Sequence, residues 1–569
     1  MLRFIIFLGV IALLGACKET NEQQEAQVVV AHLSAIPAQF RPVALEDEDK
    51  VHIFQYIHSF MLREDFTTNE LVPQTLKSIP KFNIDENCYE LALNPNAKFD
   101  DGSIITAKDI AFTLKAFSCY GISNQRRGNF ENFERIEIVD DQNLKIFISE
   151  RSVQDVILLS DYPILQESIY DTASVVSGYT FNQIYNEFDS LANSELIKWC
   201  KKMNGGYFGT FKKNLHGAGA YELTTWENDR IILSLKKNHW TQLNDNWMDK
   251  SYASQIVFKL NSDITTKTLD LKNELVAVSI DYSSKQIADF REDSSITNYY
   301  NIHAEPASAV SLVALNVNQE LSGRAPIFSD QKVRQAIALS LPIQAAIDKL
   351  SSGNVQRVAS FISINSNEYN VELEPYEYNL EKASALLEES GWKDTDQDGI
   401  LDKLIEGEKV DMILDFAFPP HPTVEAIVSL FQASLAEIGV KVNFVNGRDW
   451  QEKVADKRAF DLVFYSIANL SGHTHPYTLV LSEGIADGYN YAGYDNPLID
   501  SLITIADATF NDEARKDLLF KIQEILYHDL PYVYVGTGKR GFLVHKKYGN
   551  VNTSGITPMV RLNTLKLKE

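Results

Sequence analysis

Two histidines two positions apart are the residues whose types and spacing most readily suggest chemistry. His473 and His475 stand in the stretch "HTHP". Alternate residues of an extended chain point to the same side, so both imidazoles could meet one metal ion or a metal chelate. Two histidines in a loop are, however, more often plain polar residues. We therefore predict that they contact a ligand without holding a resident metal.

A run of acidic residues offers a second set of metal-binding groups. The stretch "DTDQDGILD" places Asp394, Asp396 and Asp398 at alternate positions before Gly399, which looks like a calcium loop. An EF-hand also needs a bidentate glutamate at its twelfth position, and that position is Ile405 here. We predict a structural turn, with a weak calcium site as the alternative.

Catalytic motifs are missing from the sequence. It contains no Gly-x-Ser-x-Gly elbow and no His-Glu-x-x-His motif. The 53 basic and 77 acidic residues are spread along the chain, and the resulting net charge of −24 repels phosphate backbones. We expect no enzymatic activity, no cofactor and no nucleic-acid partner. A secreted hydrolase is the rival from another functional class.

The first residues of the sequence have the features expected of an export signal. Arg3 is followed by the apolar run "FIIFLGVIALLGA", which is too short to span a bilayer of about 30 Å as a helix but suits a secretory signal. The run ends in "LLGAC", Leu13 to Cys17, which resembles the bacterial lipobox. We predict that residues 1–16 are a signal peptide, that Cys17 is acylated, and that residues 17–27 are a flexible tether. An ordinary cleavage site beside an accidental cysteine is the alternative.

Three further cysteines lie in the body of the chain, Cys88, Cys119 and Cys200. Their odd number and wide spacing exclude a fold that depends on a framework of disulfides. The spacing also resembles no zinc site. We predict buried thiols, with one Cys88–Cys119 bridge as the alternative.

Alternating strands and helices must position these residues. Residues 27–33 form an apolar strand, residues 49–65 carry apolar side chains at helical spacing, and Thr106 with Asp109 forms the capping box of another helix. Residues 410–445 give a β-α-β unit, whose crossover calls for parallel strands. With 569 residues the chain can build two or more cores. We predict two α/β bodies that bind a ligand in the cleft between them and close by a hinge.

Landmarks along nearly the whole chain resemble one family, the extracellular solute-binding proteins of ABC importers in the dipeptide/oligopeptide-binding class (family 5). The stretch "YELALNPNAKFDDGSIITAKDIAFTLK" is similar to the family's "F-x-L-R-x-x-x-K-F-x-D-G-x-x-x-T-A-x-D-V" signature. "GAGAYELTTWENDRIILSLKKNHW", "FSDQKVRQAIALSL" and "NLEKASALLEESGW" resemble later landmarks in the right order. The resemblance implies a two-lobed α/β fold of the type II periplasmic-binding-protein kind, with an extra inserted domain.

The resemblance also implies the division of the chain into domains. A central domain would combine residues 28–68, 200–306 and 530–569. An inserted domain would span residues 69–199, and the second lobe residues 307–529.

The predicted ligand contacts also follow from the family resemblance. Residues 460–481 fall where the family has a strand ending in "G-W-x-x-D-Y-x-x-P", whose aspartate pairs with the α-ammonium of a peptide. Aligned without gaps, the tryptophan position is Ile467 and the aspartate position is Leu470, beside Asn469. An ammonium buried without a carboxylate is costly. The missing acid favours a blocked, cyclic or non-peptide ligand, and a peptide shifted in register is the alternative.

Further contacts are predicted from position alone. His32 and Ser34 end the first strand, where the family's strand meets extended ligands, and Tyr491 lies where the second lobe faces the cleft. The full set of predicted ligand contacts is His32, Ser34, Ile467, Asn469, His473, His475 and Tyr491.

The functional expectation is an exported, membrane-anchored lipoprotein on the periplasmic or outer face of the cell envelope. We expect a monomer that captures a peptide or peptide-like solute and presents it to an ABC transporter permease. A metal chelate, an oligosaccharide or a small cationic metabolite is the rival cargo. An anchored sensor that does not import its ligand is a further alternative.

Overall fold

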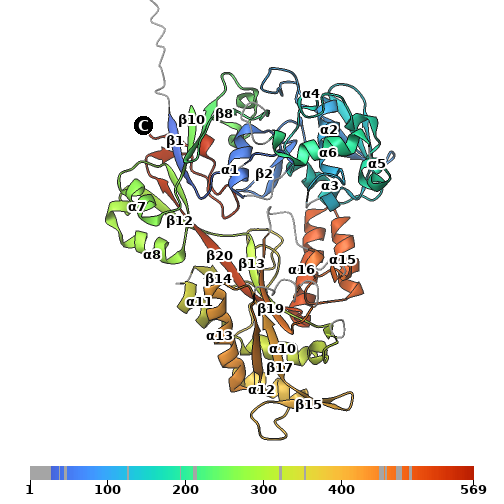
Figure 1. The fold of residues 1–569 in the computed structure, drawn as a ribbon, viewed down its shortest axis with the longest axis vertical. Helices are drawn as coiled ribbons and strands as arrows, with labels where there is room; N and C mark the ends of the chain where they lie inside the picture. The colour runs from blue at the N-terminus through green and yellow to red at the C-terminus, as the bar shows by residue number, and fades with distance from the viewer. Residues whose placement is uncertain are drawn as a thin grey trace, which may run out of the picture.

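The computed structural model shows two lobes, which lie at the top and the bottom of Figure 1. The first lobe is formed by the described residues up to the end of β12 (Tyr300–Pro306) and by those after β20 (Tyr532–His545). The described residues between β12 and β20 form the second lobe, and β20 itself pairs with strands of both lobes. The described residues are 27–37, 39–43, 48–124, 127–191, 194–208, 215–319, 323–351, 354–447, 454, 458–468, 477–485 and 490–569.

Several sequence predictions fall outside these residues. They are the signal peptide, Cys17 with nearly all of the tether, and the ligand contacts Asn469, His473 and His475. Over the part of the chain that the structure describes, no helix has both the length and the apolar character needed to cross a bilayer.

A large sheet of twelve described strands runs through both lobes. Ten of its strands follow the order β18-β17-β19-β13-β20-β11-β1-β10-β9-β8, and β12 and β14 also pair with β20. Its strands are β1 (Val28–Leu33), β8 (Tyr221–Trp226), β9 (Arg230–Leu235), β10 (Gln255–Leu260), β11 (Val278–Tyr282), β12, β13 (Ala309–Leu315), β14 (Val355–Gln356), β17 (Ile413–Ala417), β18 (Lys441–Val445), β19 (Leu462–Ala468) and β20.

The smaller sheets decorate this frame. Among the described residues they are β2 (Leu62–Asp65) with β3 (Glu70–Pro73), β15 (Asp402–Ile405) with β16 (Glu408–Asp411), β21 (Tyr548–Gly549) with β22 (Lys566–Leu567), and a sheet in the order β4 (Lys81–Asn83), β5 (Cys88–Ala92), β7 (Asn143–Ile148), β6 (Phe133–Ile138).

Helices cover the faces of the sheets in both lobes (Figure 1). In the first lobe they are α1 (Glu48–Ile57), α2 (Ala107–Ser118), α3 (Gln154–Ile157), α4 (Glu167–Tyr170), α5 (Phe181–Tyr185), α6 (Glu195–Asn204), α7 (Ile264–Lys272), α8 (Ser284–Glu292) and α9 (Ser294–Thr297). In the second lobe they are α10 (Gln331–Ser340), α11 (Ile343–Ser351), α12 (Leu380–Glu389), α13 (Pro422–Glu437), α15 (Pro497–Asp507) and α16 (Asp512–Asp529).

Local sequence signals fix several of these elements. The predicted first strand is β1, and α2 begins after Thr106, whose backbone N–H donates to the Asp109 carboxylate over 2.9 Å. The predicted β-α-β unit is also confirmed, because β17 and β18 pair in parallel on either side of α13. Its first strand starts at Ile413 rather than at residue 410, since residues 408–411 turn back as β16 onto β15.

The helix predicted over residues 49–65 is too long. α1 ends at Ile57 because Leu62 pairs with Pro73 of β3 a few residues later. Phe54 packs in the core beside β1, whereas Met61 is buried in the core around α2. The helical spacing therefore continues past the point where the chain leaves one core for another.

The predicted domain boundaries stay predictions. One helix crosses a predicted boundary without a break in packing: α6 spans residue 200, and Cys200 and Met203 pack with α2 in one core. β20, assigned to the central domain, forms part of the sheet of each lobe.

Candidate ligand-binding site

The chain crosses between the lobes where β12 is followed by β13 and where β20 returns, and we call this region the crossing. The N-terminal half of β20 pairs with β13, and its C-terminal half pairs with β12 and β11 (Figure 1). The Ala307 N–H donates to the Gly538 carbonyl over 2.8 Å, and the Thr537 hydroxyl donates to the Ala307 carbonyl over 2.6 Å. The crossing is therefore a hydrogen-bonded ladder, the natural position for a hinge.

The lobes also meet at a second place, where the loop before α3 reaches the turn between α15 and α16 (Figure 1). The Val153 N–H donates to the Asp507 carbonyl over 2.8 Å. The Arg151 guanidinium carbon lies 3.5 Å from the centre of the Phe510 ring. We call this region the lobe contact, formed by Arg151, Val153 and Asp155 from the first lobe with Asp507 and Phe510 from the second.

The lobe contact buries two carboxyl groups of like charge. Burial raises the pKa of Asp155 to about 6. Hydrogen bonds from the Ser152 N–H at 2.8 Å and the Tyr89 hydroxyl at 3.4 Å lower this pKa and only partly offset the effect of burial. Burial, and then the charge of Asp155, raises the pKa of Asp507 to about 7. One oxygen of Asp507 is buried without a hydrogen-bond partner. The arrangement is favourable when these carboxyl groups carry protons.

A second acidic pair lies across the same interface. Burial raises the pKa of Glu131 in the first lobe, and the charge of Glu483 in the second lobe raises it further. The meeting of the lobes at this edge therefore concentrates negative charge, and protonation relieves it.

Two predicted ligand contacts lie together in the second lobe. Ile467 on β19 pairs with Val310 on β13, and both Ile467 and Tyr491 pack on one apolar core. The Tyr491 ring stands edge-on to Tyr465 at 4.9 Å. β19 ends beside the crossing, since its last residue, Ala468, pairs with Ala309.

His32 occupies a different environment from the one predicted. Its side chain is buried, with Nδ1 2.6 Å from the Ser279 hydroxyl and Nε2 2.9 Å from the Asp270 carboxylate. Burial lowers the pKa of His32. Because both ring nitrogens are engaged within the first lobe, the imidazole ties β1 to β11 and α7 and presents no face to a solute in this arrangement.

Ser34 lies beside the crossing. Its hydroxyl donates to the Asp281 carboxylate, and the other oxygen of Asp281 lies 3.5 Å from the Arg540 guanidinium of β20. Ser34 is half-buried. Its predicted role as a ligand contact stays a prediction, and the neighbouring Asp281 and Arg540 are groups that sequence reasoning missed, because no motif marks them.

The acidic loop folds as a turn at the far tip of the second lobe. The Asp394 carboxylate accepts hydrogen bonds from the N–H groups of Asp398 at 3.2 Å and Gly399 at 3.0 Å. Lys409 reaches Asp396 at 2.5 Å. The ligand oxygens of the three aspartates lie within 4.8 Å of one another. The carboxylates thus already have backbone and lysine partners, and calcium binding stays the alternative to test.

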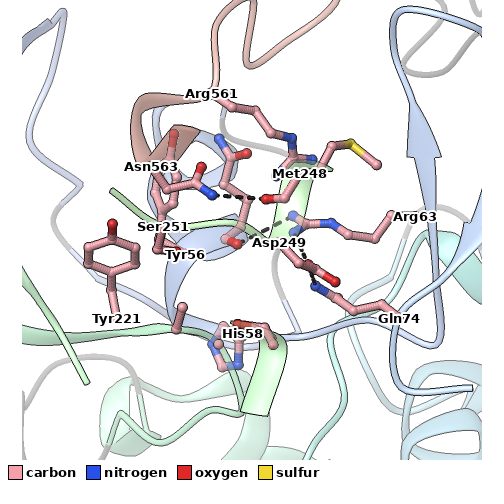
Figure 2. A pocket seen from close by; sticks show the side chains of 14 residues that line it. Tyr56, His58, Arg63, Gln74, Tyr221, Met248, Asp249, Ser251, Arg561 and Asn563 are labelled. Atoms are coloured by element: carbon pink, nitrogen blue, oxygen red, sulfur yellow. Dashed lines mark hydrogen bonds and ion pairs between the residues drawn. The ribbon is translucent and has the colours of Figure 1, made fainter. Parts of the chain in front are cut away.

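A buried polar cavity lies inside the first lobe (Figure 2). Arg63 and Arg561 point into it, and Gln74 donates to Asp249 on its wall over 2.6 Å. His58 is fully buried, with neither ring nitrogen hydrogen-bonded, and burial lowers its pKa to about 3. The cavity volume of about 20 Å³ suits a water molecule. Small-molecule sites need roughly 300 Å³ or more, so this cavity is not the site of a solute.

Comparisons with known proteins agree with this geometry. The model of the bacterial extracellular solute-binding proteins, family 5 middle region, matches residues 70–485. The oligopeptide-binding protein AppA of Bacillus subtilis is 21% identical over 529 residues, covering 92% of this chain and 88% of AppA. The structure of AppA in complex with a nonapeptide has a TM-score of 0.67 at 19% identity, covering 95% of this chain and 99% of AppA.

Two further structures share the fold. HbpA2 from Haemophilus parasuis has a TM-score of 0.73 at 17% identity, covering 95% of this chain and 100% of HbpA2. NikZ from Campylobacter jejuni, in complex with Ni(L-His), has a TM-score of 0.66 at 18% identity, covering 94% of this chain and 98% of NikZ. These likenesses confirm the predicted α/β fold of the type II periplasmic-binding-protein kind.

Proposed function

This chain belongs to the bacterial extracellular solute-binding proteins of family 5, and from that membership we propose that it captures a peptide or peptide-like solute between its lobes for an ABC importer. The observation that carries the proposal is that the two lobes are joined by the hydrogen-bonded crossing and also touch at the separate lobe contact. We call the arrangement in which the lobe contact is formed the joined state. A solute that touches both lobes stabilises the joined state, because it binds that state more tightly than a state with separated lobes. Binding of this kind needs no catalytic group.

The nature of the solute follows from the end of β19. Ile467 stands where a gap-free alignment puts the family's tryptophan, and the acidic anchor for an α-ammonium is replaced by Leu470. Burying a neutral polar group without a hydrogen bond costs about 2–7 kcal/mol. Burying an ammonium without a carboxylate costs more than this, because the group is charged. A peptide whose amino terminus is blocked or cyclised therefore fits better than one with a free amine. AppA of Bacillus subtilis, a relative with similar overall length, is an oligopeptide-binding protein.

The proposal also includes a lipid anchor for this protein and a transporter permease as its partner. We infer that Cys17 carries a lipid after removal of residues 1–16, and that residues 17–27 tether the lobes to the membrane of the cell envelope. The joined lobes then present the solute to a transporter permease. An anchored sensor would use the same lobes without a permease.

A metal chelate is the second candidate solute. NikZ, which shares the fold, was solved with Ni(L-His), and this chain carries His473 and His475 after β19. We expect weak or no protection by Ni²⁺ in a thermal melting assay. A large, saturable increase in the melting temperature that disappears in both His473→Ala and His475→Ala would instead identify a metal chelate as the solute.

Native mass spectrometry of gently purified full-length protein tests the proposed function. We expect a series of bound masses that match peptides, and the same masses after release, because the solute is returned unchanged. N-acetylated peptides should bind at least as tightly as their free-amine counterparts. Cleaved products would instead indicate a hydrolase, and a bound mass with a nickel isotope pattern would indicate a chelate.

A further inference from the structure

Two buried thiols from distant parts of the sequence touch in the first lobe. Cys119 follows directly on α2, and Cys200 lies in α6. Their sulfur atoms are 3.5 Å apart, and their exposed fractions are 0% and 3%. The Cys88–Cys119 bridge considered from the sequence is therefore the wrong pairing, because the thiol that Cys119 meets is Cys200.

The surrounding packing holds the two sulfurs in place. Both residues belong to the apolar core that α2 shares with α6. A Cβ atom on Gly121 would lie 2.8 Å from the Cys200 sulfur and 2.3 Å from the Phe188 ring. A larger residue at position 121 would collide with the Cys200 sulfur and the Phe188 ring, so the observed packing requires glycine there. A disulfide bond of about 2.05 Å requires the sulfurs to approach by roughly 1.5 Å, shared between two side-chain rotations.

The two thiols have different roles in such a reaction. The hydrogen bond from the Cys200 thiol, together with the backbone N–H of Gly121, lowers the pKa of Cys119. The same hydrogen bond and burial raise the pKa of Cys200. Cys119 is thus the thiol with more thiolate character, and the thiolate is the nucleophile in disulfide exchange.

We propose that Cys119 and Cys200 form an intramolecular disulfide in the exported protein, with Cys88 left as a free buried thiol. Family membership supports an extracellular location, and disulfides persist in oxidising compartments. Cys88 lies on β5, between β4 and β7, and so belongs to a different element from either partner. This inference goes beyond solute capture and holds whatever the solute is.

The oxidation balances with a small disulfide as oxidant, such as glutathione disulfide. The Cys119 thiolate attacks one sulfur of the oxidant and expels a thiolate, which leaves a mixed disulfide on Cys119. The Cys200 thiol gives its proton to the expelled thiolate, and its sulfur attacks the Cys119 sulfur and expels the second thiolate. The protein loses two electrons and two protons, and the oxidant leaves as two thiols.

The bond would fasten the inserted part of the first lobe. It would link residues separated by 81 positions, and long closed loops gain the most from a cross-link. Phe188 packs against the same core and lines a surface pocket of about 290 Å³ that also includes Tyr120 and Arg127.

Thiol mapping on full-length protein purified from the cell envelope tests the proposal directly. The protein is equilibrated with glutathione disulfide, denatured in N-ethylmaleimide, digested and analysed by mass spectrometry. We expect maleimide on Cys88 and a linked peptide pair containing Cys119 and Cys200, which separates after reduction. Maleimide on Cys119 and Cys200 before reduction, or a linked peptide containing Cys88, would overturn the proposal. Each cysteine is identified in its own peptide, so a lipid on Cys17 does not affect the result for the other three cysteines.

Thermal melting supplies a second, independent measurement. Dithiothreitol should lower the Tm of the oxidised wild-type protein by about 5–10 °C. The variant Cys88→Ala is the matched control, because it removes a buried thiol of the same lobe and should keep the full shift. Cys119→Ala and Cys200→Ala should lose it. An equal response to reductant in all four proteins would contradict the proposed bond.

Discussion

The crossing and the lobe contact join the same two lobes by different kinds of interaction. At the crossing, β20 pairs with strands of both lobes through backbone hydrogen bonds. At the lobe contact, a backbone hydrogen bond and a stacked guanidinium connect surfaces that also bury like-charged carboxyl groups. A β-ladder persists in every state that keeps the sheet, whereas a few side-chain contacts open at a cost of about 1–3 kcal/mol. From this comparison we expect the crossing to persist as the permanent joint and the lobe contact to open and close as the reversible one.

Gly536 provides the most severe test of the permanent joint. It lies in β20 with φ +154°, and a Cβ there would stand 2.6 Å from the Gln356 carbonyl oxygen and 2.7 Å from a methyl carbon of Val355. We expect Gly536→Ala to lower the free energy of unfolding by about 2–4 kcal/mol, because strain and a backbone clash combine. Urea denaturation measures this change.

Gly538 is the matched control on the same strand. A Cβ added there meets no atom within 4 Å. Gly538→Ala should therefore change the free energy of unfolding by less than about 1 kcal/mol. Equal losses in the two variants would mean that the packing against β14 does not define the crossing.

Arg151 tests the reversible joint. Its guanidinium stacks on Phe510 across the lobes, and such an interaction contributes about 0.5–2 kcal/mol. Arg151→Ala should weaken binding of a recovered solute by about 2–10-fold and enlarge the radius of gyration in X-ray scattering, with little effect on urea unfolding. The control is Arg135→Ala, since Arg135 stacks on Phe147 within the first lobe alone. Equal loss of affinity in both variants would argue against the lobe contact.

The pH dependence sharpens the comparison, because Asp155 and Asp507, two carboxyl groups with raised pKa, lie at the lobe contact. In the joined state the pKa is about 6 for Asp155 and about 7 for Asp507, and both exceed the ordinary value of about 3.9. The joined state therefore binds more protons, and its extra stability is present at low pH and lost as the pH rises through about 6 to 7. Solute affinity should increase several-fold between about pH 8 and about pH 5.

Asp507→Asn supplies the check on this dependence. The amide mimics the protonated group, so this variant should bind more tightly than wild type near neutral pH and lose much of the pH dependence. Asp155 and Tyr477 interact electrostatically with Asp507, and neither of them is substituted in this variant. A pH profile unchanged by the substitution would place the titration elsewhere.

Calcium is expected to have the smallest effect of all. The Asp394–Asp398 turn lies at the tip of the second lobe, and Lys409 already neutralises Asp396. Calorimetric titration with Ca²⁺ should show no saturable heat, and scattering with and without Ca²⁺ should coincide. A saturable heat that disappears in Asp394→Asn would restore the calcium alternative.

Local signals allowed much of the fold to be predicted. The capping box of Thr106 and Asp109, the apolar strand at residues 28–33 and the β-α-β unit around α13 all depend on neighbours in sequence, and the structure confirms each of them. The helix predicted through residue 65 failed because periodicity does not say which core a residue enters. Met61 keeps the helical spacing but packs with the core around α2.

The candidate site was less predictable. Ile467 and Tyr491 were placed by resemblance, and the structure brings them to one core of the second lobe. His32 was placed in the same way, yet its imidazole is held by Ser279 and Asp270, residues 247 and 238 positions away. A strand-end histidine looks the same in sequence whether it faces a ligand or a buried carboxylate.

By itself the sequence determined the family and the alternation of helices and strands. Tertiary structure alone decided that Cys119 meets Cys200, that Arg151 reaches Phe510, and that Asp155 and Asp507 are buried in one interface. The physical reason is the range of the forces involved. Capping and periodicity act within a few residues, whereas contacts between side chains that are far apart in sequence exist only after the cores and the two lobes have packed.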